Sequence, residues 1–168
     1  MTQSLPQVAH EHHERILAHV DRMPEMADAL LTDRADAIRE SVIATGEFLN
    51  GTLLPHIDAA ERTLYPELER MFQNRHSMAP MRREHDEVRR LVAEYGKLAG
   101  ELRQAQVTLG RSLALRRVIF QLYALLKVHL AEEDAYLRII NRGVSTDIGD
   151  LIAAAMEHPV AAAHPVAG

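Results

Sequence analysis

Apolar residues recur at intervals of three and four along most of this chain, which is the spacing of one face of an α-helix. The pattern predicts four helices, over residues 5–22, 34–73, 80–106 and 109–141. Pro24 interrupts the first pattern, and we expect residues 26–31 to continue it as a kinked turn. Pro55 and Pro66 lie inside the second, so we expect irregular helix there, including a kink directly before His56.

The connections between these helices are short. Residues 74–79 form a predicted loop, and Pro80 suits the first turn of the helix that follows. Four amphipathic helices joined by short loops predict an all-α fold, an up-down-up-down four-helix bundle. We expect this bundle to occupy residues 1–142 as one domain. Residues 143–168 are expected to form a short C-terminal helix and a flexible, disordered tail.

Polar side chains interrupt the apolar face of the last helix. His129 and Glu133 are four residues apart, so they point the same way from a regular helix, among Leu122, Leu126 and other apolar residues. Burying an imidazole beside a carboxylate is unfavourable unless something compensates their polarity and charge. A metal ion is the usual compensation, so this pair predicts part of a metal site.

The two halves of the chain repeat this arrangement. His13 and His56 are 43 positions apart, and His85 and His129 are 44 apart, each on the apolar face of a different predicted helix. In an antiparallel bundle such matched separations place the four imidazoles at a similar depth. One buried histidine is usually an ordinary core residue, but four at one depth indicate a metal centre. The neighbouring His12 competes with His13, and the match of His13 to His85 favours His13.

The composition narrows the chemistry of that centre. The chain has 168 residues, a net charge of −5 and no cysteine, so thiolate ligands and disulfides are excluded. Nitrogen and oxygen ligands suit iron or manganese. No basic face favours nucleic acid, and no apolar stretch approaches the roughly 20 residues of a membrane span. The first residues do not resemble a signal peptide, so we expect a cytoplasmic protein, a monomer or weak homo-oligomer.

Four motifs in order give the chain a family resemblance. They are residues 11–16 (EHHERI), 54–66 (LPHIDAAERTLYP), 83–88 (REHDEV) and 129–133 (HLAEE). Together they resemble the hemerythrin-like, or HHE cation-binding, family over residues 5–141. The resemblance implies a four-helix bundle with a non-haem di-iron site, histidine ligands from all four helices and bridging carboxylates. Its members carry or sense oxygen, handle iron, or respond to oxidative and nitrosative stress.

The chain departs from the family pattern at two positions. Ala60 stands where the family has a glutamate four residues after His56, and the nearest carboxylate is Glu61. In a regular helix Glu61 is rotated about 140° from His56, so a locally widened turn is needed to bring it inward. Met81 stands where oxygen-carrying members have a further histidine. The site is therefore either di-iron with fewer histidines or has one weakened iron position.

These observations predict a ligand set and a function. The predicted metal ligands are His13, His56, Glu61, His85, His129 and Glu133. Asp134 is the alternative carboxylate, because it corresponds to Glu61 in the repeat. We expect an iron protein, with manganese as the alternative metal, that binds or reacts with O₂, peroxide or nitric oxide. A catalase-like oxidoreductase and an iron- or oxygen-responsive regulator are the alternatives. The tyrosines, including Tyr65, are interpreted as core or interface residues.

Overall fold

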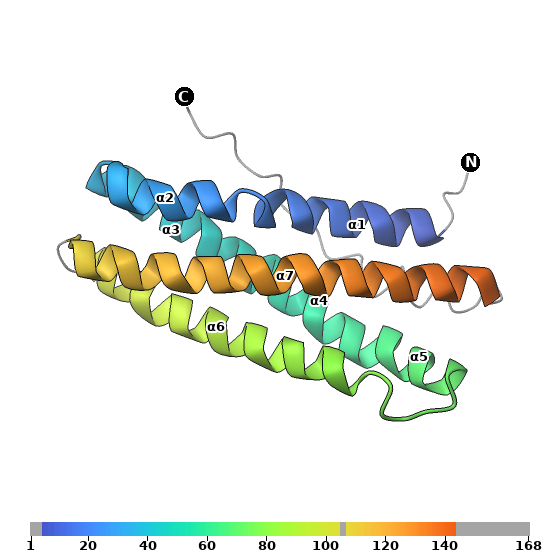
Figure 1. Cartoon of the computed structure of the whole chain (residues 1–168). Coiled ribbons are helices and arrows are strands. Elements are labelled where there is room, and N and C mark those ends of the chain that lie inside the picture. Colours follow the sequence, from blue (N-terminus) through green and yellow to red (C-terminus); the bar gives the residue numbers. More distant parts are fainter. Residues whose placement is uncertain (1–4, 105–106, 144–168) are drawn as a thin grey trace.

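The computed structural model describes residues 5–104 and 107–143, and every element within these ranges is helical (Figure 1). The predicted all-α fold is confirmed for this part of the chain. The expected C-terminal helix and disordered tail lie outside the described residues. Among the described helices, none combines the length and apolar character needed to cross a membrane.

The first predicted helix is divided in two. Helix α1 covers Leu5–Val20 and helix α2 covers Met23–Thr32, with a short turn between them. Pro24 lies in the first turn of α2, where a missing N–H leaves no hydrogen bond unmade. The break is therefore present just before Pro24, and α2, which contains Pro24, is a full helix of 10 residues rather than a kinked turn.

The second predicted helix is continuous in direction but irregular in its turns. It consists of α3 (Ala35–Phe48), the π-helical turn η1 (Leu49–Leu53), α4 (Leu54–Ala59), a second π-helical turn η2 (Ala60–Leu64) and α5 (Tyr65–Met71). The N–H of Leu54 donates to the carbonyl of Leu49, and that of Tyr65 to Ala60, both five residues back. Each widened turn is followed by a proline at the second position of the next segment, as the positions of Pro55 and Pro66 predicted.

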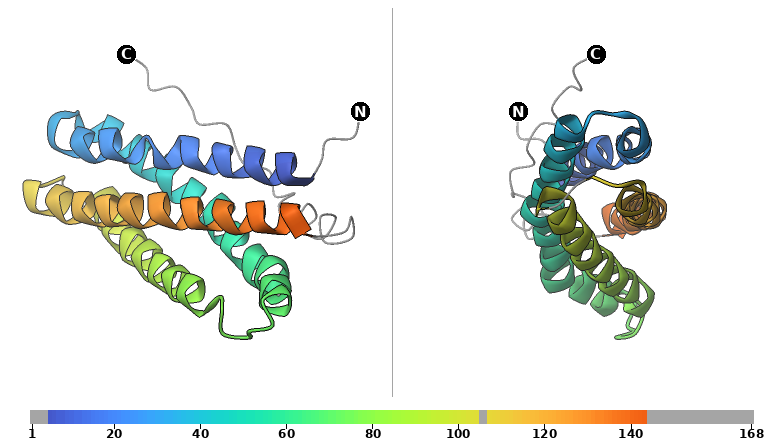
Figure 2. Two further views of the ribbon diagram at one scale, coloured as in Figure 1. Left: turned by 45° about the vertical axis from the view of Figure 1, so that its right-hand side comes forward. Right: turned by 90° about the vertical axis from the view of Figure 1, so that its left-hand side faces the viewer.

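The last two helices are long and regular. Helix α6 covers Ala79–Gln104 and α7 covers Leu109–Gly143. Figure 2 shows α7 lying alongside α1 and α2, with α6 on its other side, and α3 to α5 crossing behind. Helix α7 therefore packs against α1, α2 and α6, which surrounds its buried residues with other helices.

The buried apolar residues form two clusters, and buried polar residues lie between them along the chain. On α7 the larger cluster extends to Leu130 and the smaller one begins at Leu137. On α6 Met81 belongs to the smaller cluster and Val88 to the larger. Glu133 on α7 and His85 on α6 lie between these positions, so the helices bring polar groups to one level of an otherwise apolar core.

Candidate metal centre

Five buried polar side chains converge at this level from four helical segments. They are His13 of α1, His56 of α4, His85 of α6, and His129 and Glu133 of α7, and none is more than 1% exposed. Their burial leaves them dependent on one another, because no water competes for their nitrogen and oxygen atoms. Five of the six predicted ligands are thus brought together.

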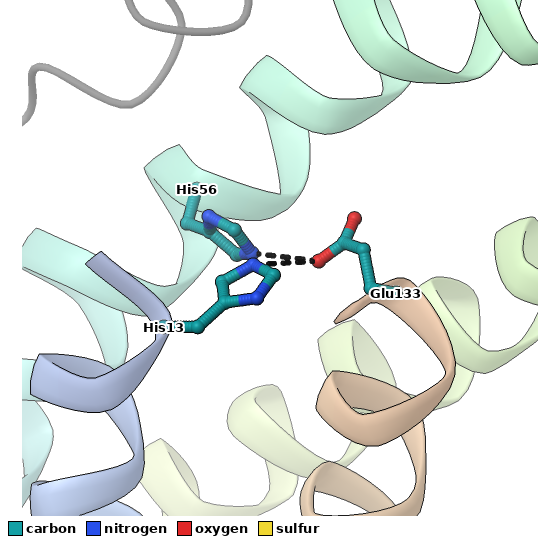
Figure 3. Close-up of side chains that lie close together, drawn as sticks. All are labelled: His13, His56 and Glu133. Atoms are coloured by element: carbon teal, nitrogen blue, oxygen red, sulfur yellow. Dashed lines mark hydrogen bonds and ion pairs between the residues drawn. The ribbon is translucent and has the colours of Figure 1, made fainter. Parts of the chain in front are cut away.

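Glu133 forms the centre of the first group. Its Oε2 atom lies 3.2 Å from Nε2 of His13 and 3.1 Å from Nε2 of His56 (Figure 3). The three side chains approach from different segments and point at one another in the figure. One ligand atom from each lies within 4.8 Å of the others, a spacing that suits a shared cation.

A second group uses the same carboxylate. Nε2 of His85 lies 2.9 Å from Nε2 of His129, and both imidazoles fall within 4.8 Å of a Glu133 oxygen. Glu133 therefore belongs to two three-residue groups. A carboxylate has two oxygens and can accept from two sides, so Glu133 can serve both groups.

Carboxylates outside this centre contact the Nδ1 atoms of three of the histidines, the atoms that face away from Glu133. Two of the three pairs involve His13 and His129, and the third involves His85. Nδ1 of His13 lies 2.7 Å from Oδ1 of Asp134, and Nδ1 of His129 lies 2.8 Å from Oε2 of Glu84. An ionised carboxylate only accepts, so Nδ1 of each ring carries a hydrogen and Nε2 faces the centre, where a neutral ring would offer its lone pair to a metal. Metal-ligating histidines are oriented in this way by their outer partners.

Glu84 was not among the predicted functional residues. Its sequence neighbours include other charged residues, and its partner His129 is 45 positions away. Only the packing of α6 against α7 brings the two together, so no local pattern could have identified it. The contact makes Glu84 a positioning residue for His129.

Glu61 is turned inward by the π-helical turn η2, but it lies behind a histidine. Its Oε1 is 2.8 Å from Nδ1 of His85 and 3.0 Å from Nη1 of Arg89. The widened turn that the sequence required is present, and Ala60 joins the smaller apolar cluster. Glu61 belongs to neither three-residue group among the described residues, so its role as a direct ligand stays a prediction, as does that of Asp134.

Tyr65 was interpreted as a core residue, and the structure places it at the centre. Its hydroxyl lies 3.1 Å from Nε2 of His85, the nitrogen that faces His129 at the centre. Its ring stacks on that imidazole. Burial and the nearby charge of Glu133 raise the pKa of Tyr65, so the phenol is neutral in the metal-free protein. Tyr65 follows η2 directly, and the widened turn that sets its direction could not be located from spacing alone.

The side chains of this centre hold their charges in a definite arrangement. Burial opposes ionisation of Glu133, but His56 and His13 outweigh it and hold the pKa of Glu133 well below its usual range. Burial likewise opposes protonation of His13, yet hydrogen bonds to Asp134 and Glu133 raise the pKa of His13 to about 9. Burial and His129 lower the pKa of His85 to about 4. A proton on His13 thus offsets the carboxylate, in the place a cation would take.

The ligand atoms of the centre are better suited to binding a metal ion than to forming hydrogen bonds with one another. Nε2 of His85 and of His129 face each other at 2.9 Å although both rings carry their hydrogen on Nδ1. Among the described residues, Oε1 of Glu133 is buried without a hydrogen-bond partner. Lone pairs collected in a dry site are unfavourable unless a cation binds them. Their nitrogen and oxygen chemistry suits iron or manganese.

His12 is buried beside the centre but outside both groups. Its ring centroid lies 5.2 Å from that of His56, and neither ring nitrogen has a hydrogen-bond partner among the described residues. Burial, with His56 and His13 nearby, lowers the pKa of His12 to about 3, so the ring is neutral. Of the two adjacent histidines, it is His13 that meets Glu133, as the repeat favoured.

Comparison with known protein families gives one match. Residues 6–137 match the family described as hemerythrin HHE cation binding domain. These residues include all five converging side chains as well as Tyr65 and Glu84. No significant match is found among curated proteins or among solved structures.

Proposed function

The chain belongs to the hemerythrin HHE cation-binding domain family, and on that premise we propose that it is a non-haem di-iron protein that binds or reacts with O₂, peroxide or nitric oxide. The observation that carries the proposal is the position of Glu133 in two groups of ligand atoms at once. One buried carboxylate between two pairs of imidazoles supports a pair of ions rather than a single one.

Each ion would have its own histidines. His13 and His56 would hold one ion and His85 and His129 the other, with Glu133 shared. When bound, iron would supply the one-electron chemistry that amino-acid side chains lack. The chain's own residues position the donors, and the apolar clusters on either side restrict access to small molecules.

The departures from the family pattern favour reaction with an added small molecule. Ala60 and Met81 stand where glutamate and histidine ligands occur in the family, and both are buried in the smaller apolar cluster. Neither supplies a carboxylate or imidazole. Fewer protein donors leave positions on the ions for an external ligand, and an apolar lining suits O₂, peroxide or nitric oxide better than a large charged substrate.

The arrangement of helices supports an up-down-up-down bundle. In Figure 1, the α1–α2 segment, the α3–α5 segment, α6 and α7 follow one another with alternating direction. This is the architecture in which facing helices carry carboxylate and imidazole ligands inward. We therefore assign the fold as a hemerythrin-like four-helix bundle.

Iron stoichiometry tests the proposed function. The metal-free protein is reconstituted anaerobically with ferrous iron, desalted and analysed for metal. We expect about two irons per wild-type chain, a marked loss in His129→Ala, and no loss in His76→Ala, whose imidazole is exposed in the loop before α6. Less than about half an iron per wild-type chain, or equal loading of His129→Ala, would contradict it.

A second candidate function is peroxide disproportionation, in which two peroxide molecules yield two waters and one O₂. Tyr65 favours it, because a phenol hydroxyl 3.1 Å from a ligand nitrogen is a redox-active group at the centre. Oxygen evolution from peroxide well above that of free iron, lost in Tyr65→Phe, would support this candidate. Iron binding without turnover would leave reversible binding or sensing as the function.

A further inference from the structure

We propose that the two metal positions are unequal, and that the position of His85 and His129 fills first. This inference rests on the proposed function and deepens it by assigning an order of loading. It concerns the residues behind the histidines rather than the histidines themselves. We call the position of His85 (α6) and His129 (α7) the inner-helix position. We call the position of His13 (α1) and His56 (α4) the outer-helix position.

The inner-helix position has two anionic supports. Glu61 lies 2.8 Å from Nδ1 of His85 and Glu84 lies 2.8 Å from Nδ1 of His129. Both carboxylates are about a quarter exposed, so water still solvates part of each carboxylate. Each makes its imidazole a stronger donor at Nε2, because the negative charge favours electron density on the ring.

The outer-helix position has only one such support. Asp134 lies 2.7 Å from Nδ1 of His13, but Nδ1 of His56 is buried and has no hydrogen-bond partner in the described part of the chain. The ring of His12 lies beside it, tilted, with 5.2 Å between ring centroids, and both nitrogens of His12 are likewise buried without a hydrogen-bond partner among the described residues. His56 therefore lacks both the orientation and the charge that the other three histidines receive.

Tyr65 increases the difference. Its hydroxyl reaches the His85 side of the centre, so the inner-helix position has a further oxygen within reach. Loss of one outer partner typically lowers metal affinity 10- to 100-fold. A difference of one carboxylate and one phenol between the positions therefore predicts intrinsic affinities that differ by at least about 10-fold.

A titration with Mn²⁺ tests the order. Metal-free protein is titrated while free Mn²⁺ is followed by its electron paramagnetic resonance signal, and two stepwise dissociation constants are fitted. Repulsion between two cations makes the second step weaker in any such centre, so the ratio of the two constants in wild type alone decides nothing. The informative quantity is how that ratio changes when one support loses its charge.

Two matched variants remove one charge each while keeping an oxygen for the Nδ1 hydrogen. Glu84→Gln weakens the first step about 10-fold, so the two constants approach each other. Asp134→Asn weakens the second step about 10-fold, so they separate further. Equal positions would instead widen the ratio in both variants, and the reverse order would exchange their effects. Either result would overturn the inference.

Two controls distinguish a change in metal affinity from a loss of folding. Circular dichroism and thermal unfolding establish that each variant is folded, and Glu61→Gln, which supports His85, replaces Glu84→Gln if the latter does not fold. Failure of wild type to bind Mn²⁺ at all would contradict the proposed function itself. Two binding steps that respond wrongly to the variants would contradict only the order of loading.

Discussion

At the scale of single residues, the visible absorption of Tyr65 would report whether iron binds in the centre. Its pKa is raised in the metal-free protein, but a ferric ion beside the oxygen would stabilise the phenolate. We therefore expect the ferric protein to show a broad visible absorption band from the phenolate-iron pair, and Tyr65→Phe to lack it. Visible spectroscopy at equal iron loading measures the difference.

Tyr95 provides the matched control for that comparison. It is as buried as Tyr65, but its hydroxyl donates to the carbonyl of Val42, in the larger apolar cluster. Tyr95→Phe should keep the band. Identical visible spectra for wild type and Tyr65→Phe would show that the phenol is only a packing residue.

Residue spacing was sufficient for the converging side chains but not for their supports. His13, His56, His85, His129 and Glu133 were predictable because each lies on the apolar face of a helix, and local periodicity identifies that face. Glu84 and Tyr65 were not, because their roles depend on contacts between helices and on a widened turn. Such contacts leave no trace in the spacing of one helix.

At the scale of elements, the two π-helical turns around α4 set the direction of the second helical segment. Pro55 and Pro66 marked where regular helix would fail, because proline cannot donate the next backbone hydrogen bond. The extra residue in η2 turns Glu61 toward α6 and leaves Ala60 in the apolar cluster. Whether a proline produces a kink or a π turn depends on packing, so the sequence predicted the place but not the form.

Ala60→Glu tests this description of η2. Ala60 is 2% exposed among apolar residues, so a carboxylate there is buried without a partner in the metal-free protein. We expect the free energy of unfolding to fall by roughly 2–5 kcal/mol, and added Mn²⁺ to restore part of it if the new carboxylate reaches an ion. Chemical denaturation with and without metal measures both effects.

Ala131→Glu is the control for that substitution, because Ala131 is exposed on α7 close to His129. It should change stability by less than about 0.5 kcal/mol. An Ala60→Glu protein as stable as Ala131→Glu without metal would mean that position 60 faces solvent or a partner that the described structure does not place there.

At the scale of the whole molecule, the buried histidines link stability to pH in the metal-free protein. Folding lowers the pKa of His12 to about 3 and of His85 to about 4, from 6.5. The unfolded chain therefore binds more protons below pH 6.5, and stability falls as the pH decreases. At pH 5 each group has removed about 2 kcal/mol relative to neutral pH.

His13 acts in the opposite direction. Its pKa is raised to about 9, so its contribution is complete below pH 6.5 and is lost as the pH rises toward 9. Between pH 7 and 5 it adds less than about 1 kcal/mol, so the net change is a loss. Denaturation with a chelator present, at pH 7 and pH 5, measures this. A metal-free protein that is as stable at pH 5 as at pH 7 would contradict the burial of neutral imidazoles.

Two metal ions joined by Glu133 in one centre would be magnetically coupled, and this coupling can be measured. Protein loaded with two equivalents of Mn²⁺ is examined by electron paramagnetic resonance at low temperature. Two ions that share a carboxylate lie about 4 Å apart and give an exchange-coupled spectrum, which Glu133→Ala should abolish. Wild-type protein that binds two equivalents yet shows only the six-line signal of isolated Mn²⁺ would mean that Glu133 does not join the two ions.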